Sequence, residues 1–241
     1  CFSSPFDFSA VDFLETLNVP AYKIASFEIH DIPLIEYVAS KGKPVIISTG
    51  IATLPEIEEA IAACRKVGNN QISILKCTSS YPAPAEEANL LTIPDIAKRF
   101  DVVAGLSDHT MGSTATIAAV ALGARVIEKH FIIDREIGGP DAAFSMNFEE
   151  FKQMVDDVRM VEKLLGQVNY DLTPKTIKSR VHGRSLFVAE DIKKGEVFTS
   201  KNVRSVRPSH GLHPRYLPDV LGKKANRDLE MGTPFSLDMI E

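Results

Sequence analysis

The sequence has few of the features that mark membrane-spanning, nucleic-acid-binding or disulfide-rich proteins. No apolar run reaches the roughly 18 residues that span a bilayer. Asp and Glu (32) outnumber Lys and Arg (27), and no basic stripe is interleaved with aromatic residues, which argues against a nucleic-acid partner. The cysteines are few, odd in number and without metal-ligand spacing. We therefore expect Cys1, Cys64 and Cys77 to be reduced and mostly buried in a cytoplasmic protein.

Short apolar runs alternate with helical patterns through the first two thirds of the chain. The runs have strand length and are rich in Val and Ile: AYKIAS, KPVIIST, QISILKCTS, DVVAGLSD and ARVIEKHF. Amphipathic patterns lie before, between and after them, over 9–17, 31–41, 54–67, 93–100, 113–122 and 147–165. This alternation predicts β/α units around a parallel sheet that is buried on both faces.

The pattern changes after residue 165. Residues 166–183 are polar, contain Pro174 and lack a clear period, which is typical of a linker. Residues 184–241 alternate short apolar runs with tight turns and lack long helices, so we expect a small, mainly β domain there. The predicted organisation is an α/β catalytic domain over 1–165, a linker over 166–183 and a second domain over 184–241.

Polar or small residues follow every predicted strand of the first domain. The carboxyl ends of parallel strands meet at one edge of a sheet or barrel, where the active sites of such folds lie. Five successive strand ends that are dense in hydrogen-bonding groups therefore predict a site. These residues are Lys23, Ser26, Glu28, Ser48, Thr49, Gly50, Thr78, Ser79, Ser80, Tyr81, Ser107, Asp108, His109, Glu128, Lys129 and His130.

Two histidines end neighbouring predicted strands, His109 in GLSDHT and His130 in VIEKHF. Two imidazoles at one sheet edge suit a divalent transition metal, with water and substrate oxygens completing an open, catalytic type of site. The alternative is that each ring is satisfied separately by backbone groups, as most buried polar side chains are.

Lys23 lies inside an apolar run, on the same face as the small residues Ala21 and Ala25, which leave it room to reach inward. A buried lysine needs an anion, and strand-end hydroxyls with a lysine suit a phosphate. Turn chemistry explains any one of the serines, though less readily the set. A lysine can also form a Schiff base, so an aldolase chemistry stays open.

Several motifs occur in the order found in the sialic acid synthase family: FSSPFD, AYKIASFE, KPVIISTG, KCTSSYP, GLSDHT, IEKHF, GPDAAFSMN and RSLFVAEDIKKGE. The chain resembles that family over nearly its whole length. RPSHGLHP, and Ser79 where sialic acid synthases typically carry asparagine, favour its pseudaminic branch. The resemblance implies a (β/α)8-type barrel, lacking its first strands here, plus a small C-terminal antifreeze-like (SAF) domain. We expect the chain to begin at the end of the third strand, without the family's catalytic glutamate.

The resemblance implies the condensation of phosphoenolpyruvate with a 6-deoxy-2,4-diacetamido hexose, giving pseudaminic acid and phosphate. N-acetylneuraminate and legionaminate synthases are the alternatives within the family. It also implies a divalent metal on His109 and His130, usually Mn²⁺, with Mg²⁺ or Co²⁺ as alternatives.

Roles for individual residues follow from the same resemblance. Phosphoenolpyruvate is held by Lys23, Ser26, Ser48, Ser79 and Ser107, with Ser4 as a further contact. Lys23, Glu28, Tyr81 and Asp141 form the catalytic set, in which Asp141 lies on the sugar side. Arg207 reaches over the partner's sugar in a domain-swapped homodimer.

Two rival functions remain. A Schiff-base aldolase would use Lys23 and pyruvate, and borohydride trapping would reveal its imine. A non-catalytic binding module, in which the small C-terminal domain recognises a surface or a polymer, would need no metal, and the two strand-end histidines argue against it. We expect neither a membrane nor a nucleic-acid partner.

Overall fold

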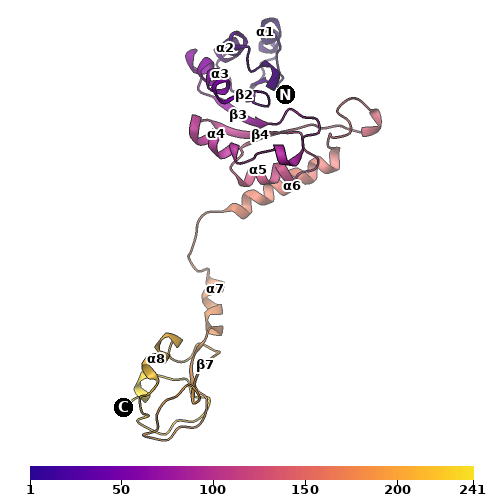
Figure 1. Cartoon of the computed structure of the whole chain (residues 1–241). Coiled ribbons are helices and arrows are strands. Elements are labelled where there is room, and N and C mark those ends of the chain that lie inside the picture. The colour runs from indigo at the N-terminus through magenta and orange to yellow at the C-terminus, as the bar shows by residue number, and fades with distance from the viewer. The chain divides into compact units, whose positions relative to one another are not determined.

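The computed structural model describes all 241 residues and divides them into two units, Cys1–Gln167 and Val168–Glu241. Unit 1 holds the larger set of helices and strands, and unit 2 follows the extended segment after the last long helix (Figure 1). None of the helices is both long and apolar enough to cross a membrane.

Unit 1 is built on a five-stranded parallel sheet. The strands are β1 (Tyr22–Ile24), β2 (Val45–Ser48), β3 (Ile72–Cys77), β4 (Val103–Asp108) and β5 (Val126–Lys129), and each pairs with the next in chain order. An unbroken order of this kind belongs to β/α barrels, whereas doubly wound sheets reverse it. The sheet does not close, because β1 and β5 do not pair. The predicted fold class is confirmed as a partial (β/α) barrel.

Helices connect the strands and cover one face of the sheet. They are α1 (Phe8–Thr16), α2 (Ile32–Ser40), α3 (Leu54–Lys66), α4 (Thr92–Phe100), α5 (Thr114–Ala121) and α6 (Phe148–Leu165). Among them, α2 packs against α3, and α5 packs against α6. Short 3₁₀ turns follow β1 (η1, Ser26–Glu28), β3 (η2, Ala85–Glu87) and β5 (η3, Arg135–Ile137).

Capping residues account for where the two longest helices begin. Thr53 precedes α3, and its backbone N–H donates to the Glu56 carboxylate at 2.6 Å. At the start of α6, the Asn147 N–H donates to Glu150 and the Glu150 N–H donates back to the Asn147 side chain. Such capping boxes satisfy N–H groups that have no partner inside the helix.

The core of unit 1 lies between the sheet and the helices. Ile24, Ile47 and Ile74 come from adjacent strands and are fully buried, and they belong to one cluster with Ile35 of α2 and Ile61 of α3. Burying such side chains contributes about 1.5–3 kcal/mol each. This packing fixes the strands, so the residues just beyond their carboxyl ends are held in place.

Unit 2 is small and mainly β, as the sequence predicts. Strand β6 (Ser185–Val188) pairs antiparallel with β7 (Val203–Val206), and isolated bridges extend the arrangement. Its core holds Phe198 and Phe235, whose ring centroids lie 4.9 Å apart. The remaining helical segments are α8 (Leu217–Val220) and the short turns η4 (Arg180–His182), η5 (Pro214–Tyr216) and η6 (Leu237–Met239).

One helix lies in the segment that the sequence analysis interprets as an irregular linker. Helix α7 (Pro174–Ser179) begins after Thr173, whose hydroxyl accepts from the backbone N–H of Thr176 at 3.1 Å. Pro174 at the first helical position has its φ already set for a helix. This helix could not be predicted from hydrophobic periodicity, because its six residues are fewer than two turns.

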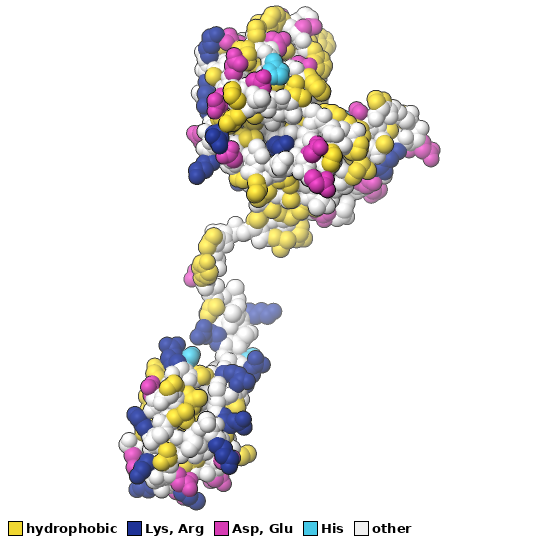
Figure 2. All heavy atoms as spheres, in the orientation of Figure 1, with side chains coloured by type: hydrophobic (Ala, Val, Ile, Leu, Met, Phe, Trp, Pro, Cys, Tyr) yellow, Lys and Arg dark blue, Asp and Glu magenta, His cyan; other side chains and the backbone are white.

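The two units differ in charge. Residues 1–167 contain 23 Asp and Glu against 14 Lys and Arg, whereas residues 168–241 contain 9 against 13. Figure 2 shows many Lys and Arg side chains over the surface of unit 2. Unit 2 therefore has a net positive charge, which suits anionic partners, whereas unit 1 has a net negative charge.

Candidate active site

The site lies at the carboxyl ends of the five strands, where successive βα segments bring polar side chains together. Side-chain alternation along β4 and β5 directs Ser107 and Glu128 to the inner face of the sheet, and strand register pairs these two residues. His109 and His130 follow two residues later on the same face. The sheet edge predicted from the sequence is thus the place where these groups meet.

An ionic contact crosses the inner face of the sheet. The Nζ of Lys23 lies 3.5 Å from Oε2 of Glu128, although Lys23 is on the first strand and Glu128 on the fifth. The contact requires a sheet that curves so that the inner faces of its outer strands approach each other. Ser107 donates to the other carboxylate oxygen of Glu128 at 2.6 Å.

Burial lowers the pKa of Lys23, and the negative charge of Glu128 opposes that shift. The Lys23 ammonium also donates to the carbonyl of Ile24 at 3.1 Å. A buried ammonium with one carboxylate at a loose distance is poorly compensated, because desolvation disfavours the charged form. The position therefore favours an anionic ligand, which would supply the missing negative charge.

Hydroxyl groups and a glycine line the space beside Lys23. Ser79 donates to the Ser26 hydroxyl at 3.3 Å, and the buried Ser48 hydroxyl has no hydrogen-bond partner. A Cβ built on Gly50 would lie 2.1 Å from Oγ of Ser79 and 2.6 Å from Oγ of Ser26. Gly50 thus lets the backbone approach these hydroxyls closely. The set is suited to the oxygens of a phosphate or carboxylate.

The two histidines lie next to each other. The ring centroids of His109 and His130 are 5.3 Å apart. Nδ1 of His109 is 3.0 Å from the Thr78 carbonyl, and Nδ1 of His130 is 3.6 Å from the Asp141 carboxylate. Burial, and then the neighbouring His109, lowers the pKa of His130, which favours its neutral form.

This donor set fits a divalent metal. With each Nδ1 turned toward an oxygen, the Nε2 atoms remain as ligands, the arrangement in which a second group orients a ligating imidazole. No group of three or more His, Cys, Asp or Glu side chains is placed to hold a metal by itself. Two imidazoles would therefore leave positions open for water or substrate, as in catalytic rather than structural sites.

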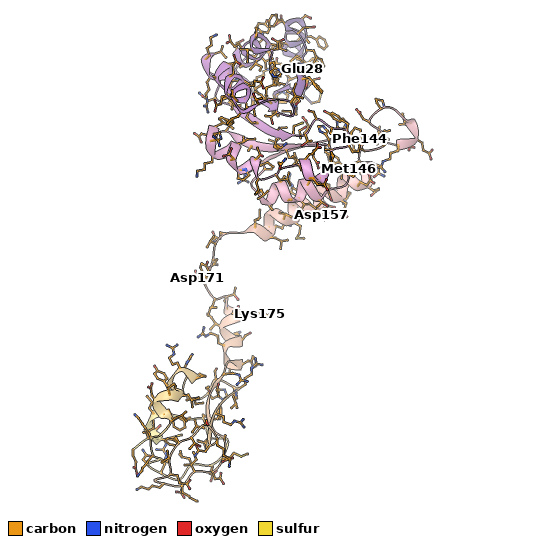
Figure 3. All side chains as sticks on the ribbon, in the orientation of Figure 1. Glu28, Phe144, Met146, Asp157, Asp171 and Lys175 are labelled. Atoms are coloured by element: carbon orange, nitrogen blue, oxygen red, sulfur yellow. The ribbon has the colours of Figure 1, made fainter.

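Aromatic rings enclose the histidines. Tyr81 lies 4.3 Å from His109 between ring centroids, and Phe144 lies 5.1 Å from His130. Burial raises the pKa of Tyr81, so its hydroxyl keeps its proton. Phe144 and Met146 come from the loop after β5, which returns to the strand end, where the Met146 N–H donates to the His130 carbonyl at 2.9 Å (Figure 3).

Glu28 enters from η1, after β1 (Figure 3). Its Oε2 atom is buried and has no hydrogen-bond partner. Buried polar atoms without partners are few in native proteins, so such an atom beside the polar strand ends points to a missing ligand. The Asp141 carboxylate is half exposed and belongs to the loop that carries Phe144.

The two remaining predicted site residues belong to segments other than the strand ends of the sheet. Ser4 is half-buried in the segment before α1, where the neighbouring Ser3 carbonyl accepts from the Lys23 N–H at 3.3 Å. Arg207 belongs to unit 2 and borders a hollow of about 510 Å³ that Arg180 and Arg184 also line.

Sequence reasoning assigned no role to Glu128, although it noted this residue among the strand-end polar groups. The signal was present, because Glu128 and His130 are two apart and so share a face of the strand. Cys64 and Cys77 are free and buried, whereas Cys1 is free and exposed. The Sγ atom of Cys77 lies 3.9 Å from both the Ser79 Oγ and the His109 Nδ1, on the inner face of the sheet.

Comparison with known proteins places both parts of the chain. The profile of the NeuB family matches residues 1–170, and that of the SAF domain matches residues 183–241. A pseudaminic acid synthase of Helicobacter pylori is 49% identical over 241 residues, which are 100% of this chain and 71% of that protein. An N,N'-diacetyllegionaminic acid synthase of Campylobacter jejuni is 39% identical over 94% of this chain and 69% of that protein.

A solved structure agrees with these relatives. The spore coat polysaccharide biosynthesis protein SpsE of Bacillus subtilis matches with a TM-score of 0.65 and 38% identity, over 100% of this chain and 73% of that one. The resemblance inferred from the motifs is confirmed. Its (β/α) barrel with a small SAF domain agrees with the two units described above, and the chain belongs to the NeuB family.

Proposed function

We propose that the protein condenses phosphoenolpyruvate with a 6-deoxy-2,4-diacetamido hexose to give pseudaminic acid and phosphate. The observation that carries the proposal is 49% identity to a pseudaminic acid synthase along the whole chain. The inner face of the sheet supports it chemically, because it combines an undercompensated cation, a buried hydroxyl without a partner and a pair of imidazoles.

The phosphoenolpyruvate end of the site is formed by Lys23 and the strand-end serines. We assign the phosphate and carboxylate oxygens to Lys23, Ser26, Ser48, Ser79 and Ser107, with Ser4 as an outer contact. Lys23 supplies charge, and the hydroxyls orient the anion. Catalysis by this group is therefore positioning and electrostatic, with no covalent bond to the protein.

The metal ligands in the proposal are His109 and His130, and the ion is Mn²⁺, with Mg²⁺ and Co²⁺ as the alternatives. When bound there, a divalent metal acts as a Lewis acid toward the aldehyde oxygen of the sugar. Thr78 and Asp141 orient the two rings through their Nδ1 atoms.

The sugar end is assigned to Glu28, Tyr81 and Asp141. The protonated Tyr81 hydroxyl donates a hydrogen bond, whereas the partnerless Glu28 oxygen accepts one or takes up a proton. The C3 methylene of phosphoenolpyruvate attacks the aldehyde carbon, water adds at C2, and phosphate leaves by cleavage of the C–O bond. We assign to Phe144, whose ring centroid lies 5.1 Å from that of His130, the shielding of this ring from water.

Arg207 is assigned to the sugar of a second copy in a domain-swapped homodimer. The basic character of unit 2 and the acidic character of unit 1 support such an exchange, because opposite charges favour association. Gel filtration with light scattering tests the dimer, and a monomeric active enzyme would remove this part of the proposal. We place the protein in the cytoplasm, where phosphoenolpyruvate is available.

Phosphate release tests the substrate assignment. The chain covers 71% of the length of the Helicobacter pylori relative, and the assay uses the full-length protein. It contains phosphoenolpyruvate, Mn²⁺ and either the diacetamido hexose or N-acetylmannosamine, with a chelator control. We expect chelator-sensitive release with the diacetamido hexose alone. Release with N-acetylmannosamine, or with the legionaminate precursor, would move the assignment to that branch.

The Schiff-base aldolase is the second candidate, and the lowered pKa of Lys23 favours it. Borohydride with pyruvate separates the two chemistries, since only an imine leaves a reduced adduct on the protein. We expect no mass increase at Lys23, because phosphoenolpyruvate already carries the enol that an aldolase must generate.

A further inference from the structure

A buried ion pair lies behind the histidine pair, on the opposite face of the sheet. Register pairs Asp108 of β4 with Lys129 of β5, and these residues directly precede His109 and His130. The Lys129 Nζ is 2.9 Å from Oδ2 of Asp108, and the two side chains are 2% and 1% exposed. The pair is therefore enclosed between the strands and the helix that follows β4.

Every oxygen of the Asp108 carboxylate is satisfied. Oδ1 accepts from the N–H and the hydroxyl of Thr110, at 2.9 and 2.8 Å. Oδ2 accepts from the Thr116 hydroxyl of α5 and from Lys129, both at 2.9 Å. Lys129 also donates to the Thr110 carbonyl at 2.7 Å. The network thus bonds both the backbone N–H and the backbone carbonyl of Thr110, the residue after His109.

Stability alone gives no reason for an ion pair at this position. Apolar residues of similar size are often as stabilising as a buried pair, whose desolvation offsets its attraction. A fully satisfied network does specify one geometry. Here it joins the ends of two strands at the residues next to His109 and His130.

We propose that Asp108 and Lys129 are positioning residues, which hold His109 and His130 at the separation that a divalent metal requires. The inference rests on the metal site of the proposed function. Alternation explains how it operates, because each strand directs its charged residue outward and its histidine inward. Holding Asp108 and Lys129 in place therefore also holds the backbone positions of His109 and His130, from which the two rings extend.

Metal binding without turnover tests the inference. The variants are Asp108→Asn and the double variant Asp108→Asn with Lys129→Met, in which neither charge is left unpaired. Asp95→Asn is the control, because Asp95 pairs with Arg99 on the exposed surface of α4. Free Mn²⁺ is followed by electron paramagnetic resonance in substrate-free protein, and melting in chelator reports the fold.

We expect both Asp108 variants to bind Mn²⁺ about 10–100-fold more weakly, as removal of ligand-orienting partners does elsewhere. The control should bind as wild type does. A folded double variant with wild-type Mn²⁺ affinity would overturn the inference. So would loss of folding in both variants, which would make the pair a folding determinant. If wild-type protein itself binds no Mn²⁺, the metal site of the proposed function fails first, and the positioning role with it.

Discussion

The two faces of the sheet each carry one lysine–carboxylate pair near the site, and the pairs differ in how completely they are satisfied. On the outer face, Lys129 and Asp108 are 2.9 Å apart, nearly inaccessible and hydrogen-bonded throughout. On the inner face, Lys23 and Glu128 are 3.5 Å apart, and the Glu128 side chain is 41% exposed. The charges and hydrogen-bonding groups of the outer pair are all satisfied, whereas the inner pair could accept the negative charge of a ligand.

Other inner-face groups share this incompleteness. The Ser48 hydroxyl and one Glu28 oxygen are buried without partners, and the only other such side-chain atom lies in unit 2. Buried groups in native proteins are usually paired because an unpaired one costs about 1–3 kcal/mol. The contrast between the faces shows that residue type alone does not mark the site in unit 1, whereas its two buried side-chain atoms without partners do.

The largest expected effect comes from removing an inner-face metal ligand. We predict that His130→Ala abolishes Mn²⁺ binding and lowers kcat/KM by at least about 10³-fold, because a Lewis acid supplies several kcal/mol. Steady-state phosphate release and an Mn²⁺ titration measure the two effects. His30→Ala is the matched control, since this exposed ring lies 3.1 Å from Glu56 at the start of α3. Chelator-sensitive turnover at the wild-type rate in His130→Ala would contradict the assignment.

Much of the fold could be predicted from the sequence. Val- and Ile-rich runs such as KPVIIST between amphipathic helices indicate a parallel sheet, and its strand ends indicate the edge that carries the site. The pairing of Lys23 with Glu128 could not be predicted. These residues are 105 positions apart, on strands that do not pair, and they meet only because the sheet curves.

Lys129 shows the limit of a period-two argument. Alternation places Lys129 on the face opposite to Glu128 and His130, but it does not say what the ammonium contacts there. Its partner is decided by strand register, which pairs it with Asp108, and by α5, which brings Thr116. Strand register and the packing of α5 are both tertiary features, so a local sequence pattern cannot predict them.

A second prediction concerns the space between Gly50 and the serine hydroxyls beside Lys23. Gly50→Ala places a Cβ 2.1 Å from the Ser79 hydroxyl, which must move. We expect phosphoenolpyruvate affinity to fall about 10–100-fold, because overpacking costs about 1–3 kcal/mol. Isothermal titration calorimetry measures this loss. Adding Ser79→Ala, which removes the nearest clashing atom, should restore part of the affinity, and unchanged binding in Gly50→Ala would show that the anion lies elsewhere.

A third prediction concerns pH. Burial holds the pKa of Lys23 below its usual value of 10.5, so the ammonium is lost earlier in the alkaline range. Phosphoenolpyruvate binding should weaken as pH rises through this window, whereas Lys23→Arg, which stays charged, should lose less. Calorimetry across the alkaline range measures both. Equal pH profiles for wild type and Lys23→Arg would argue against Lys23 as the anion's partner.

The same shift has an opposite effect on stability. The ligand-free folded state releases the Lys23 proton at a lower pH than the unfolded chain does. Because the unfolded state then binds more protons, the contribution of Lys23 to the free energy of unfolding rises with pH in that window. Denaturant unfolding of wild type and Lys23→Met should therefore diverge on the alkaline side.

The smallest expected effect belongs to the outer face. Thr116→Val removes one fully buried donor to Asp108. We predict a loss of about 1–2 kcal/mol in the free energy of unfolding and unchanged phosphoenolpyruvate affinity. Denaturant unfolding and calorimetry provide the two readouts. A large loss of affinity with wild-type stability would erase the distinction between the faces.

The most direct test compares the two lysines. Lys23→Met and Lys129→Met are the same substitution on opposite faces, and each variant is examined in chelator for melting temperature and for phosphoenolpyruvate binding. We predict that Lys23→Met folds normally and loses binding. Lys129→Met should be destabilised by about 3–5 kcal/mol, because it leaves the Asp108 charge buried and unpaired, and its folded fraction should still bind. The reverse pattern, or the same pattern in both variants, would contradict the division between a ligand-binding inner face and a structural outer face.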